Sequence, residues 1–148
     1  MALPDFNDDG DLPAGIHRAT LTETLTRFGG GSAQRRAVAE RLNRIYQLVR
    51  STGQLARFAV FGSFVTAKAD PRDVDVIFLM EDAFVLDAVT GEVALVFQHA
   101  AADNHFGASV FWARRSTAFG GEQAMIEYWQ VRREGGKRGI VEIVEEQP

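Results

Sequence analysis

The clearest pattern along the chain is a helical repeat of apolar positions between residues 32 and 50. Within this stretch apolar side chains recur three and four residues apart, at Val38, Leu42, Ile45, Leu48 and Val49. That spacing places them on one face of a helix. Ser32 is a favourable N-cap residue, and Gly53 is placed to end the segment. We expect a helix from Ser32 to about Arg50, with its arginines on a solvated face.

A shorter helix is predicted just before this one. Thr20 and Glu23 have the spacing of a capping box, in which each side chain accepts a hydrogen bond from a backbone N–H at the other position. The apolar residues that follow share one helix face: Leu21, Leu25 and Phe28. Consecutive glycines at residues 29–31 then end the segment.

Four segments have the composition or period of strands. Residues 57–61 and 74–80 are apolar at nearly every position, which is typical of strands buried on both faces. A third strand is expected near residues 108–113. Residues 140–144 alternate around Glu142, so we expect a half-exposed strand there that could pair at a sheet edge.

The rest of the chain connects these elements. Residues 1–19 combine prolines, glycines and several aspartates, which predicts an irregular lead-in that wraps the surface. Short helical segments are predicted at residues 64–68, within 91–102 and at 122–130. No internal repeat or low-complexity linker divides the sequence. Residues 1–148 are therefore expected to form one domain of the α/β (α+β) class.

Composition excludes some functional classes. A formal net charge of -4 gives no overall basic field for nucleic acid or an anionic membrane, although it leaves room for a local basic patch. The absence of cysteine excludes disulfides and thiolate metal sites. The first residues lack the pattern of a signal peptide, and no apolar run has membrane-spanning length. We expect a cytoplasmic protein that does not act at a membrane.

The candidate chemistry lies around the strand at residues 74–80. Asp73 and Asp75 are two residues apart, and in an extended strand such side chains point to the same side. Neighbouring carboxylates repel each other unless a cation lies between them, and hard oxygen ligands suit Mg²⁺ or Mn²⁺. The pair therefore predicts a divalent metal site.

A second motif precedes this pair. Gly62 ends the strand at residues 57–61 and lets the backbone approach a ligand closely. Ser63 would begin a short helix, whose free N–H groups favour phosphate. Two carboxylates near a turn can also be ordinary solvated or capping residues, and glycosyltransferases use a similar acidic pair. The latter alternative leaves the Gly-Ser motif unexplained. The three histidines are interpreted as packing or surface residues. The tryptophans and phenylalanines are interpreted as core residues rather than as a base-stacking platform.

Together, Gly62-Ser63, nine further residues and Asp73-Val74-Asp75 resemble the signature of the DNA polymerase beta-type nucleotidyltransferase superfamily. A longer set of residues more closely resembles an uncharacterised bacterial nucleotidyltransferase-like family, DUF6932. This set comprises Phe61 to Thr66, Lys68, Pro71, Val76, Pro4-Asp5-Phe6, Leu12-Pro13, Gly15-Ile16-His17 and Lys137 to Val141. The resemblance spans most of the chain.

The resemblance implies a minimal nucleotidyltransferase fold, with a short mixed β-sheet flanked by helices. It implies that Asp73 and Asp75 are the catalytic metal ligands, and that Gly62 and Ser63 bind a nucleoside triphosphate. Lys68 and Arg72 are further candidates for phosphate contacts, although Lys68 could instead shape the loop, and Arg72 could instead form a surface ion pair.

Active members of the superfamily usually carry a third carboxylate on a later strand. The corresponding segment here, Ala108 to Trp112, contains no acid, and the nearest carboxylate is Asp103. Asp103 is therefore the candidate third metal ligand.

Two functional hypotheses result. In the first, the protein is a Mg²⁺-dependent enzyme that transfers a nucleoside monophosphate from a triphosphate to an acceptor hydroxyl on a protein, an RNA or a small molecule, with release of pyrophosphate. In the second, it is a catalytically weak or inactive binding protein, antitoxin-like, with a toxin-like protein partner. The absence of an acid on the later strand favours the second hypothesis, whereas both aspartates and the Gly-Ser motif are what catalysis requires.

Overall fold

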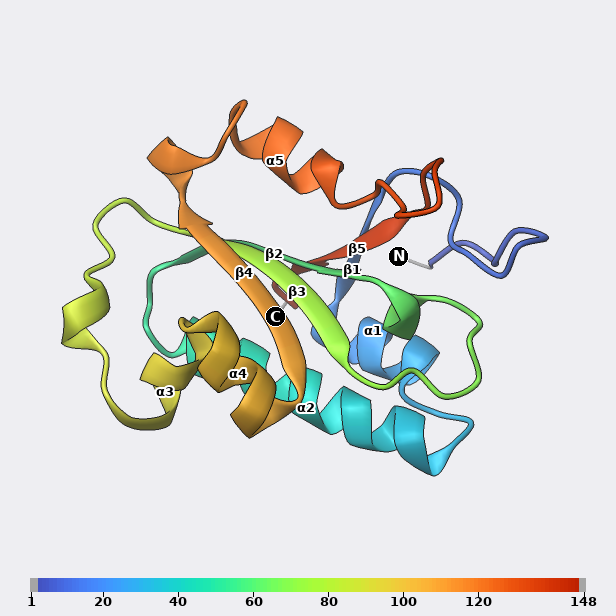
Figure 1. Cartoon of the computed structure of the whole chain (residues 1–148), viewed down its shortest axis with the longest axis horizontal. Coiled ribbons are helices and arrows are strands. Elements are labelled where there is room, and N and C mark those ends of the chain that lie inside the picture. The colour runs from blue at the N-terminus through green and yellow to red at the C-terminus, as the bar shows by residue number, and fades with distance from the viewer. Residues whose placement is uncertain (1–2, 147–148) are drawn as a thin grey trace.

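The structure, a computed structural model that describes residues 3–146, is built on a five-stranded mixed sheet (Figure 1). The strands are β1 (Ile16–Thr20), β2 (Leu55–Phe61), β3 (Val74–Met80), β4 (Ala108–Arg114) and β5 (Ile140–Val144), in the spatial order β1-β5-β2-β3-β4. The outer pairs, β1 with β5 and β3 with β4, are parallel, and β2 is antiparallel to both of its neighbours. This confirms the expected combination of a mixed sheet with flanking helices.

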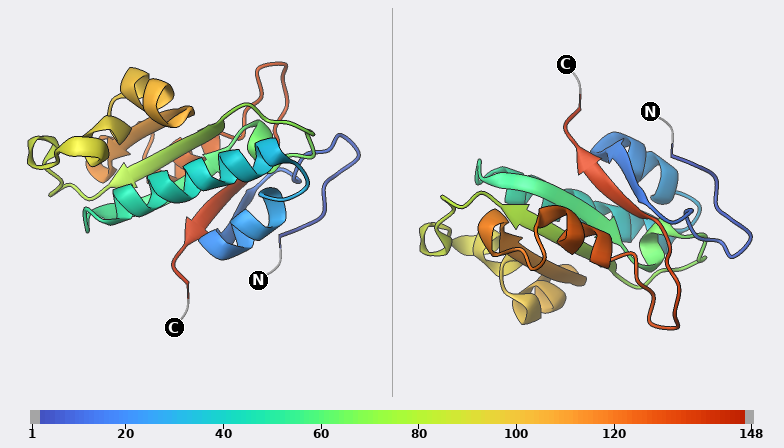
Figure 2. Two further views of the ribbon diagram at one scale, coloured as in Figure 1. Left: turned by 90° about the horizontal axis from the view of Figure 1, so that it is seen from below. Right: turned by 90° about the horizontal axis from the view of Figure 1, so that it is seen from above.

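Helices cover the two faces of the sheet unequally (Figure 2). The helices are α1 (Leu21–Phe28), α2 (Ala33–Arg50), α3 (Gly91–Val96), α4 (His99–Phe106) and α5 (Glu122–Tyr128). The left-hand view of Figure 2 shows α2 lying across one face beside α1, α3 and α4, and the right-hand view shows α5 on the other face. We call these the α2 face and the α5 face.

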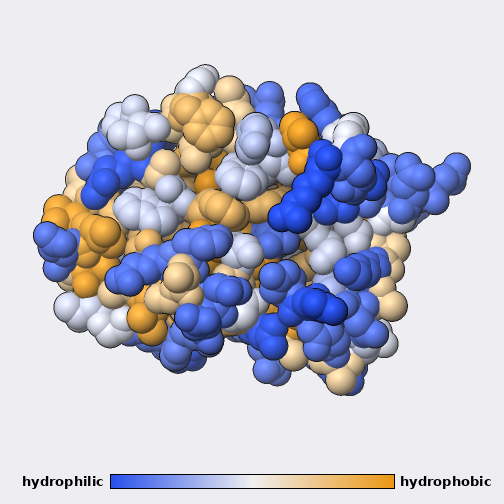
Figure 3. All heavy atoms as spheres, in the orientation of Figure 1, coloured by the Kyte–Doolittle hydropathy of each residue, from blue (hydrophilic) through white to orange (hydrophobic). Residues whose placement is uncertain are grey.

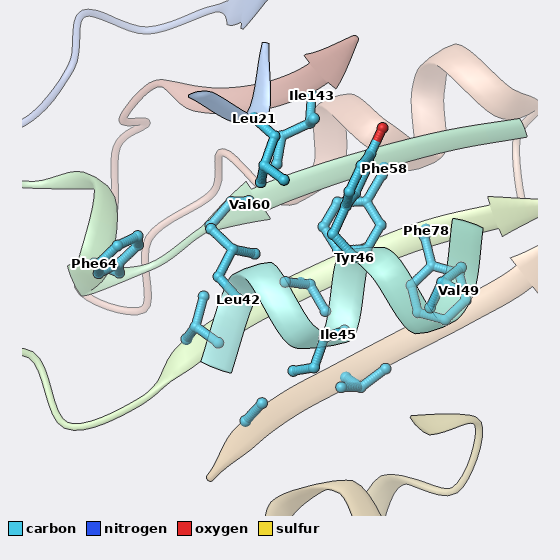
Figure 4. Close-up of a cluster of buried hydrophobic side chains, with 14 of the residues drawn as sticks. Leu21, Leu42, Ile45, Tyr46, Val49, Phe58, Val60, Phe64, Phe78 and Ile143 are labelled. Atoms are coloured by element: carbon cyan, nitrogen blue, oxygen red, sulfur yellow. The ribbon is translucent and has the colours of Figure 1, made fainter. Parts of the chain in front are cut away.

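The larger core lies on the α2 face (Figure 4). The buried side of α2 packs Leu42, Ile45 and Val49 against the sheet, as the helical repeat predicts, and Tyr46 is buried beside them. The ring of Phe58 from β2 stacks on Phe78 from β3 with 5.7 Å between centroids. Apolar burial on this face provides most of the driving force for folding.

A smaller core lies on the α5 face. It comprises Ala59, Ile77, Leu79, Met125, Ile126 and Ile140. Because successive side chains of a strand point to opposite faces, Asp75 shares the α5 face with Ile77 and Leu79. The acidic end of β3 therefore lies beside α5, away from the large core.

Local signals in the sequence are confirmed at several element boundaries. Thr20 and Glu23 form both hydrogen bonds of a capping box at the start of α1. The hydroxyl of Ser32 accepts from the backbone N–H of Arg35 at the start of α2. β3 spans residues 74–80, as predicted.

Two predictions about the sheet are wrong. The irregular lead-in does not extend to residue 19, since residues 16–20 form β1 at one edge; residues 1–2 lie outside the described part. β5 is an interior strand rather than a half-exposed one at an edge. Glu142 on β5 is only 6% exposed because Arg57 of β2 pairs with it at 2.8 Å.

Two helical segments are also shorter than predicted. The stretch at 64–68 contains only a single 3-10 turn, Ser63–Val65, which we call η1. The stretch within 91–102 is divided into α3 and α4 around Phe97, which packs against Phe78 and Phe84 and interrupts the helix.

Arg35 fixes the loop after η1 against α2. It is 8% exposed, although the sequence predicted a solvated position. Its guanidinium donates to the backbone carbonyls of Phe28 at 3.0 Å, Phe64 at 2.8 Å and Thr66 at 2.6 Å. These carbonyls belong to the end of α1 and to the turn that begins at Ser63, so one side chain connects both segments to α2.

Replacing Arg35 with Met should therefore lower the free energy of unfolding by at least about 2 kcal/mol, because several buried carbonyls lose a charged donor. Urea denaturation followed by circular dichroism would measure the change. Arg36→Met is the matched control, since Arg36 is the exposed neighbour on the same helix. Equal stability of the two variants would contradict the assigned role of Arg35.

Candidate functional site

A cavity of about 420 Å³ opens on the α5 face where β2 ends and where β3 and β4 begin. Its polar wall on the sheet side consists of Gly62, Ser63, Asp75 and Ser109. Gly62 and Asp75 meet there because Phe61, the last residue of β2, pairs with Asp75 across the antiparallel ladder. Two motifs separated in sequence are thus brought to one point.

Gly62 lies directly against the carboxylate of Asp75. Its backbone has φ 80° and ψ -164°, a combination that is open almost only to glycine. A Cβ at this position would lie 2.0 Å from Oδ2 of Asp75. Glycine is therefore required twice here, by the backbone conformation and by the close approach.

Ser63 begins the turn η1, which is closed by its own hydrogen bonds. The carbonyl of Ser63 accepts from the Thr66 backbone N–H at 3.2 Å and from the Thr66 hydroxyl at 2.7 Å. A single turn sums few peptide dipoles, so the helix dipole expected here is small. Attraction of an anion to this corner therefore depends mainly on individual N–H groups and nearby cations.

Burial raises the pKa of Asp75 from 3.8 to about 6, and the charge of Asp73 adds to this effect. A hydrogen bond from Ser109 and the charges of Arg138 and Arg133 act in the opposite direction. Asp73 lies in the bend just before β3 rather than within the strand, and it does not line the cavity. The two carboxylates still lie close enough for the charge of Asp73 to act on Asp75, although Asp73 is outside the strand in which the sequence placed it.

The structure does not bring the other predicted residues into this cavity. Lys68 and Arg72 are exposed and do not line it. The carbonyl of Arg72 accepts from Arg41 at 3.1 Å, and that of Lys68 accepts from Arg35, so the backbones of both residues face α2. Their role as phosphate contacts stays a prediction, and it would require a ligand that extends beyond this cavity.

Asp103 lies on α4, on the α2 face. It lines a separate cavity of about 600 Å³, together with Arg41, Arg44 and His105 among others. Within residues 3–146, no three or more histidine, aspartate and glutamate side chains are grouped to hold a metal ion. Asp103 therefore does not share a cavity with Asp75, because its helix packs on the opposite side of the sheet.

Sequence reasoning missed the wall of the cavity opposite Asp75. After α5 the chain turns back through a Val131–Lys137 bridge, with glycines at 135 and 136 at the tip. We call residues 131–138 the arginine hairpin. It adds Arg132, Arg133, Glu134 and Arg138 to the lining. The available signal was the charged run at 132–138, which is rich in arginine and interrupted by two glycines.

Aromatic side chains complete the cavity. The ring of Trp129 lies 4.7 Å from those of Phe61 and Phe111, centroid to centroid, and Tyr128 stands beside it. All four rings line the cavity, which differs from the prediction that the aromatic residues only fill the core. The indole N–H of Trp129 is buried and has no acceptor among the described residues.

Gly62→Ala should destabilise the protein by at least about 2 kcal/mol more than Gly121→Ala, because only the first adds a clash to the unfavourable backbone conformation. Gly121 is a matched control: its φ and ψ are 94° and 165°, and nothing lies within 4 Å of its added Cβ. Chemical denaturation measures both. Adding Asp75→Ala to Gly62→Ala should recover part of the loss, and strict additivity would contradict the direct contact.

The stability of the metal-free protein should depend on Asp75 between pH 4 and 7. Its folded pKa is raised, so the folded state holds the proton more tightly, and this stabilising contribution is lost as the pH rises through about 6. Asp75→Asn should therefore exceed wild type by roughly 2 kcal/mol at pH 7.5, with the difference vanishing near pH 3.5. Urea titrations in EDTA would test this; a difference independent of pH would contradict it.

No helix among the described residues has the length and apolar composition needed to cross a membrane.

Comparison with known proteins identifies the family of the chain. No curated protein and no solved structure matches the chain significantly. A family model described as a family of unknown function matches residues 4–144, nearly the whole chain. The protein therefore belongs to the DUF6932 family.

Proposed function

We propose that this protein is a Mg²⁺-dependent nucleotidyltransferase that acts at the cavity beside Asp75. The observation that carries the proposal is the contact between the Gly62 backbone and the Asp75 carboxylate. It places a Gly-Ser turn and an acidic pair at one corner of the sheet. That combination resembles the nucleotide and metal site of the nucleotidyltransferase superfamily.

The chemistry of the donor set fits a divalent cation. Asp73 and Asp75 repel each other, and Asp75 is partly buried, so a bound cation would relieve an unfavourable charge. Mg²⁺ is commonly held by one or two carboxylates together with substrate phosphates rather than by a complete protein cage. When bound, Mg²⁺ would neutralise charge on the phosphates and on the leaving pyrophosphate.

The remaining tasks belong to the chain itself. The backbone at Gly62 admits a phosphate close to the carboxylates, and Ser63 offers a hydroxyl and an N–H to its oxygens. An acceptor hydroxyl oxygen would form a bond to the α-phosphorus while the bond from that phosphorus to the bridging oxygen breaks. Pyrophosphate leaves, and the hydroxyl proton passes to a base. Protein, RNA and small-molecule acceptors are all compatible with this reaction.

A second candidate function is nucleotide binding without transfer, as in a regulatory or antitoxin-like protein. A specific observation favours it. The β4 residue beside Asp75 in the register is Ser109, not a carboxylate, and Asp103 lies on the other face. In this case the same cavity would bind the nucleotide, and a protein partner such as a toxin would respond to its occupancy.

Thermal denaturation tests the shared site. Mg²⁺ with a nucleoside triphosphate at about 100 times its dissociation constant should raise the melting temperature by about 5–10 °C. The rise should require the metal and disappear in Asp73→Asn/Asp75→Asn. Asp87→Asn is the control, because Asp87 is an exposed aspartate in the turn at residues 86–88.

The two candidate functions differ in the step after binding. Release of pyrophosphate from a triphosphate labelled at its β-phosphate, in the presence of candidate acceptors, would support transfer. Metal-dependent binding with no pyrophosphate release from any acceptor would favour the regulatory role. Absence of a thermal shift with all four triphosphates, in Mg²⁺ and in Mn²⁺, would contradict both.

A further inference from the structure

We propose that Arg133 and Arg138 of the arginine hairpin bind the polyphosphate of the ligand, and that Trp129 contacts its planar base. The inference deepens the proposed function and rests on it for the identity of the ligand as a nucleotide. It replaces Lys68 and Arg72 as the phosphate-binding cations. The substrate class is then a compound with a polyphosphate and an aromatic base, bound across the cavity from Asp75.

The arginine hairpin forms one wall of the cavity beside Asp75. The hairpin follows α5 and lines the same cavity as Gly62, Ser63 and Asp75. In Figure 1 it lies beyond the end of α5, beside the N-terminal segment. Figure 3, in the same orientation, shows strongly hydrophilic side chains there next to paler and apolar ones. A charged wall thus borders an aromatic one, as a ligand with an anionic and a planar part requires.

The lining of the cavity carries an excess of positive charge. The charged groups that line the cavity are three arginines against Asp75 and Glu134, a surplus of one positive charge in a chain of net charge -4. Arg132 pairs with Glu134 at 2.8 Å. Among the described residues, no carboxylate lies within ion-pair distance of Arg133. Its guanidinium therefore remains available to an anion, and arginine suits phosphate because its planar donors bind two oxygens at once.

Asp75 is not an ion-pair partner of Arg133 or Arg138. Arg133 and Arg138 influence its charge, but in the described structure neither forms an ion pair with it within 4 Å. Space therefore separates the carboxylate from the guanidinium groups. A phosphate chain placed in that space would face a carboxylate-bound cation on one side and arginines on the other.

The hairpin is held in place rather than free. Asp11 is 6% exposed and pairs with Arg132 at 3.2 Å and Arg138 at 3.8 Å. The Gly15 backbone N–H donates to the side chain of Gln130 at 2.6 Å. The N-terminal segment thus positions Arg132 and Arg138 before a ligand arrives, which reduces the ordering cost of binding.

Trp129 supplies the aromatic contact. Its ring and that of Phe111 both line the cavity, and Phe111 is 36% exposed. Aromatic side chains bind bases by stacking, with little dependence on which base is present.

Binding of inorganic tripolyphosphate in EDTA tests the arginines without metal or catalysis. Isothermal titration at low salt should show binding to wild type that weakens at least tenfold in Arg133→Ala and in Arg138→Gln. Arg36→Ala, Lys68→Ala and Arg72→Ala are charge-matched controls and should bind as wild type does. Arg133→Ala is the decisive variant, because this side chain is exposed and forms no ion pair with any residue in the range 3–146.

Tryptophan fluorescence tests the base contact. The chain has two tryptophans, and Trp112 packs on the α2 face, where its indole donates to the Phe97 carbonyl at 3.0 Å. ATP or GTP should quench wild-type fluorescence, and Trp129→Phe should abolish the quenching. Inorganic tripolyphosphate should quench much less than either nucleotide. Equal quenching in Trp129→Phe would overturn the base contact.

The outcomes separate this inference from the proposed function. Tripolyphosphate binding that depends on Arg133 supports the arginine assignment, even if no metal-dependent shift occurs and the proposed function fails. A metal-dependent shift through Asp73 and Asp75 that is unchanged in Arg133→Ala and Arg138→Gln would overturn the assignment and leave the proposed function standing. Weakening by Lys68→Ala or Arg72→Ala instead would also overturn it.

Discussion

The close approach of the Gly62 backbone to the Asp75 carboxylate is the constraint on which the candidate site depends. A single carbon atom at Gly62 would lie 2.0 Å from Oδ2 of Asp75. The approach is possible because Phe61 and Asp75 pair across β2 and β3, and because Arg35 holds the following turn against α2. The antiparallel ladder and one buried arginine thus determine where the two motifs meet.

The large core and the candidate site lie on opposite faces of the sheet. The α2 face carries the larger core, whereas the α5 face combines a small apolar cluster with a cavity. A partly buried carboxylate such as Asp75 reduces stability, and a large core elsewhere offsets this cost. The short α5 covers only part of its face, so the end of the sheet stays open beside the arginine hairpin.

Much of the fold could be predicted from local patterns. The capping box at Thr20, the N-cap at Ser32 and the bounds of β3 all depend on residues close together in sequence. The orientation of Asp75 follows from the period of a strand, and the burial of the opposite face confirms it.

The errors have a common cause, which is partners distant in sequence. Glu142 is polar in a short strand, and its burial becomes favourable through Arg57, 85 residues away, with Arg18 also within ion-pair distance at 3.9 Å. Arg35 resembles any solvated helix residue until the turn after Ser63 folds over it. The strand at residues 16–20 exists because β5 pairs with it. The arginine hairpin resembles a solvated charged loop in the sequence, and its place in the cavity depends on Asp11.

The most direct test of the account is a crystal structure of the protein with Mg²⁺ and a triphosphate analogue that cannot be cleaved between its α- and β-phosphates. The account predicts metal density at Asp73 and Asp75, phosphates beside Ser63 and Arg133, and the base against Trp129. Nucleotide bound instead in the cavity between α2 and α4, beside Asp103, would contradict it.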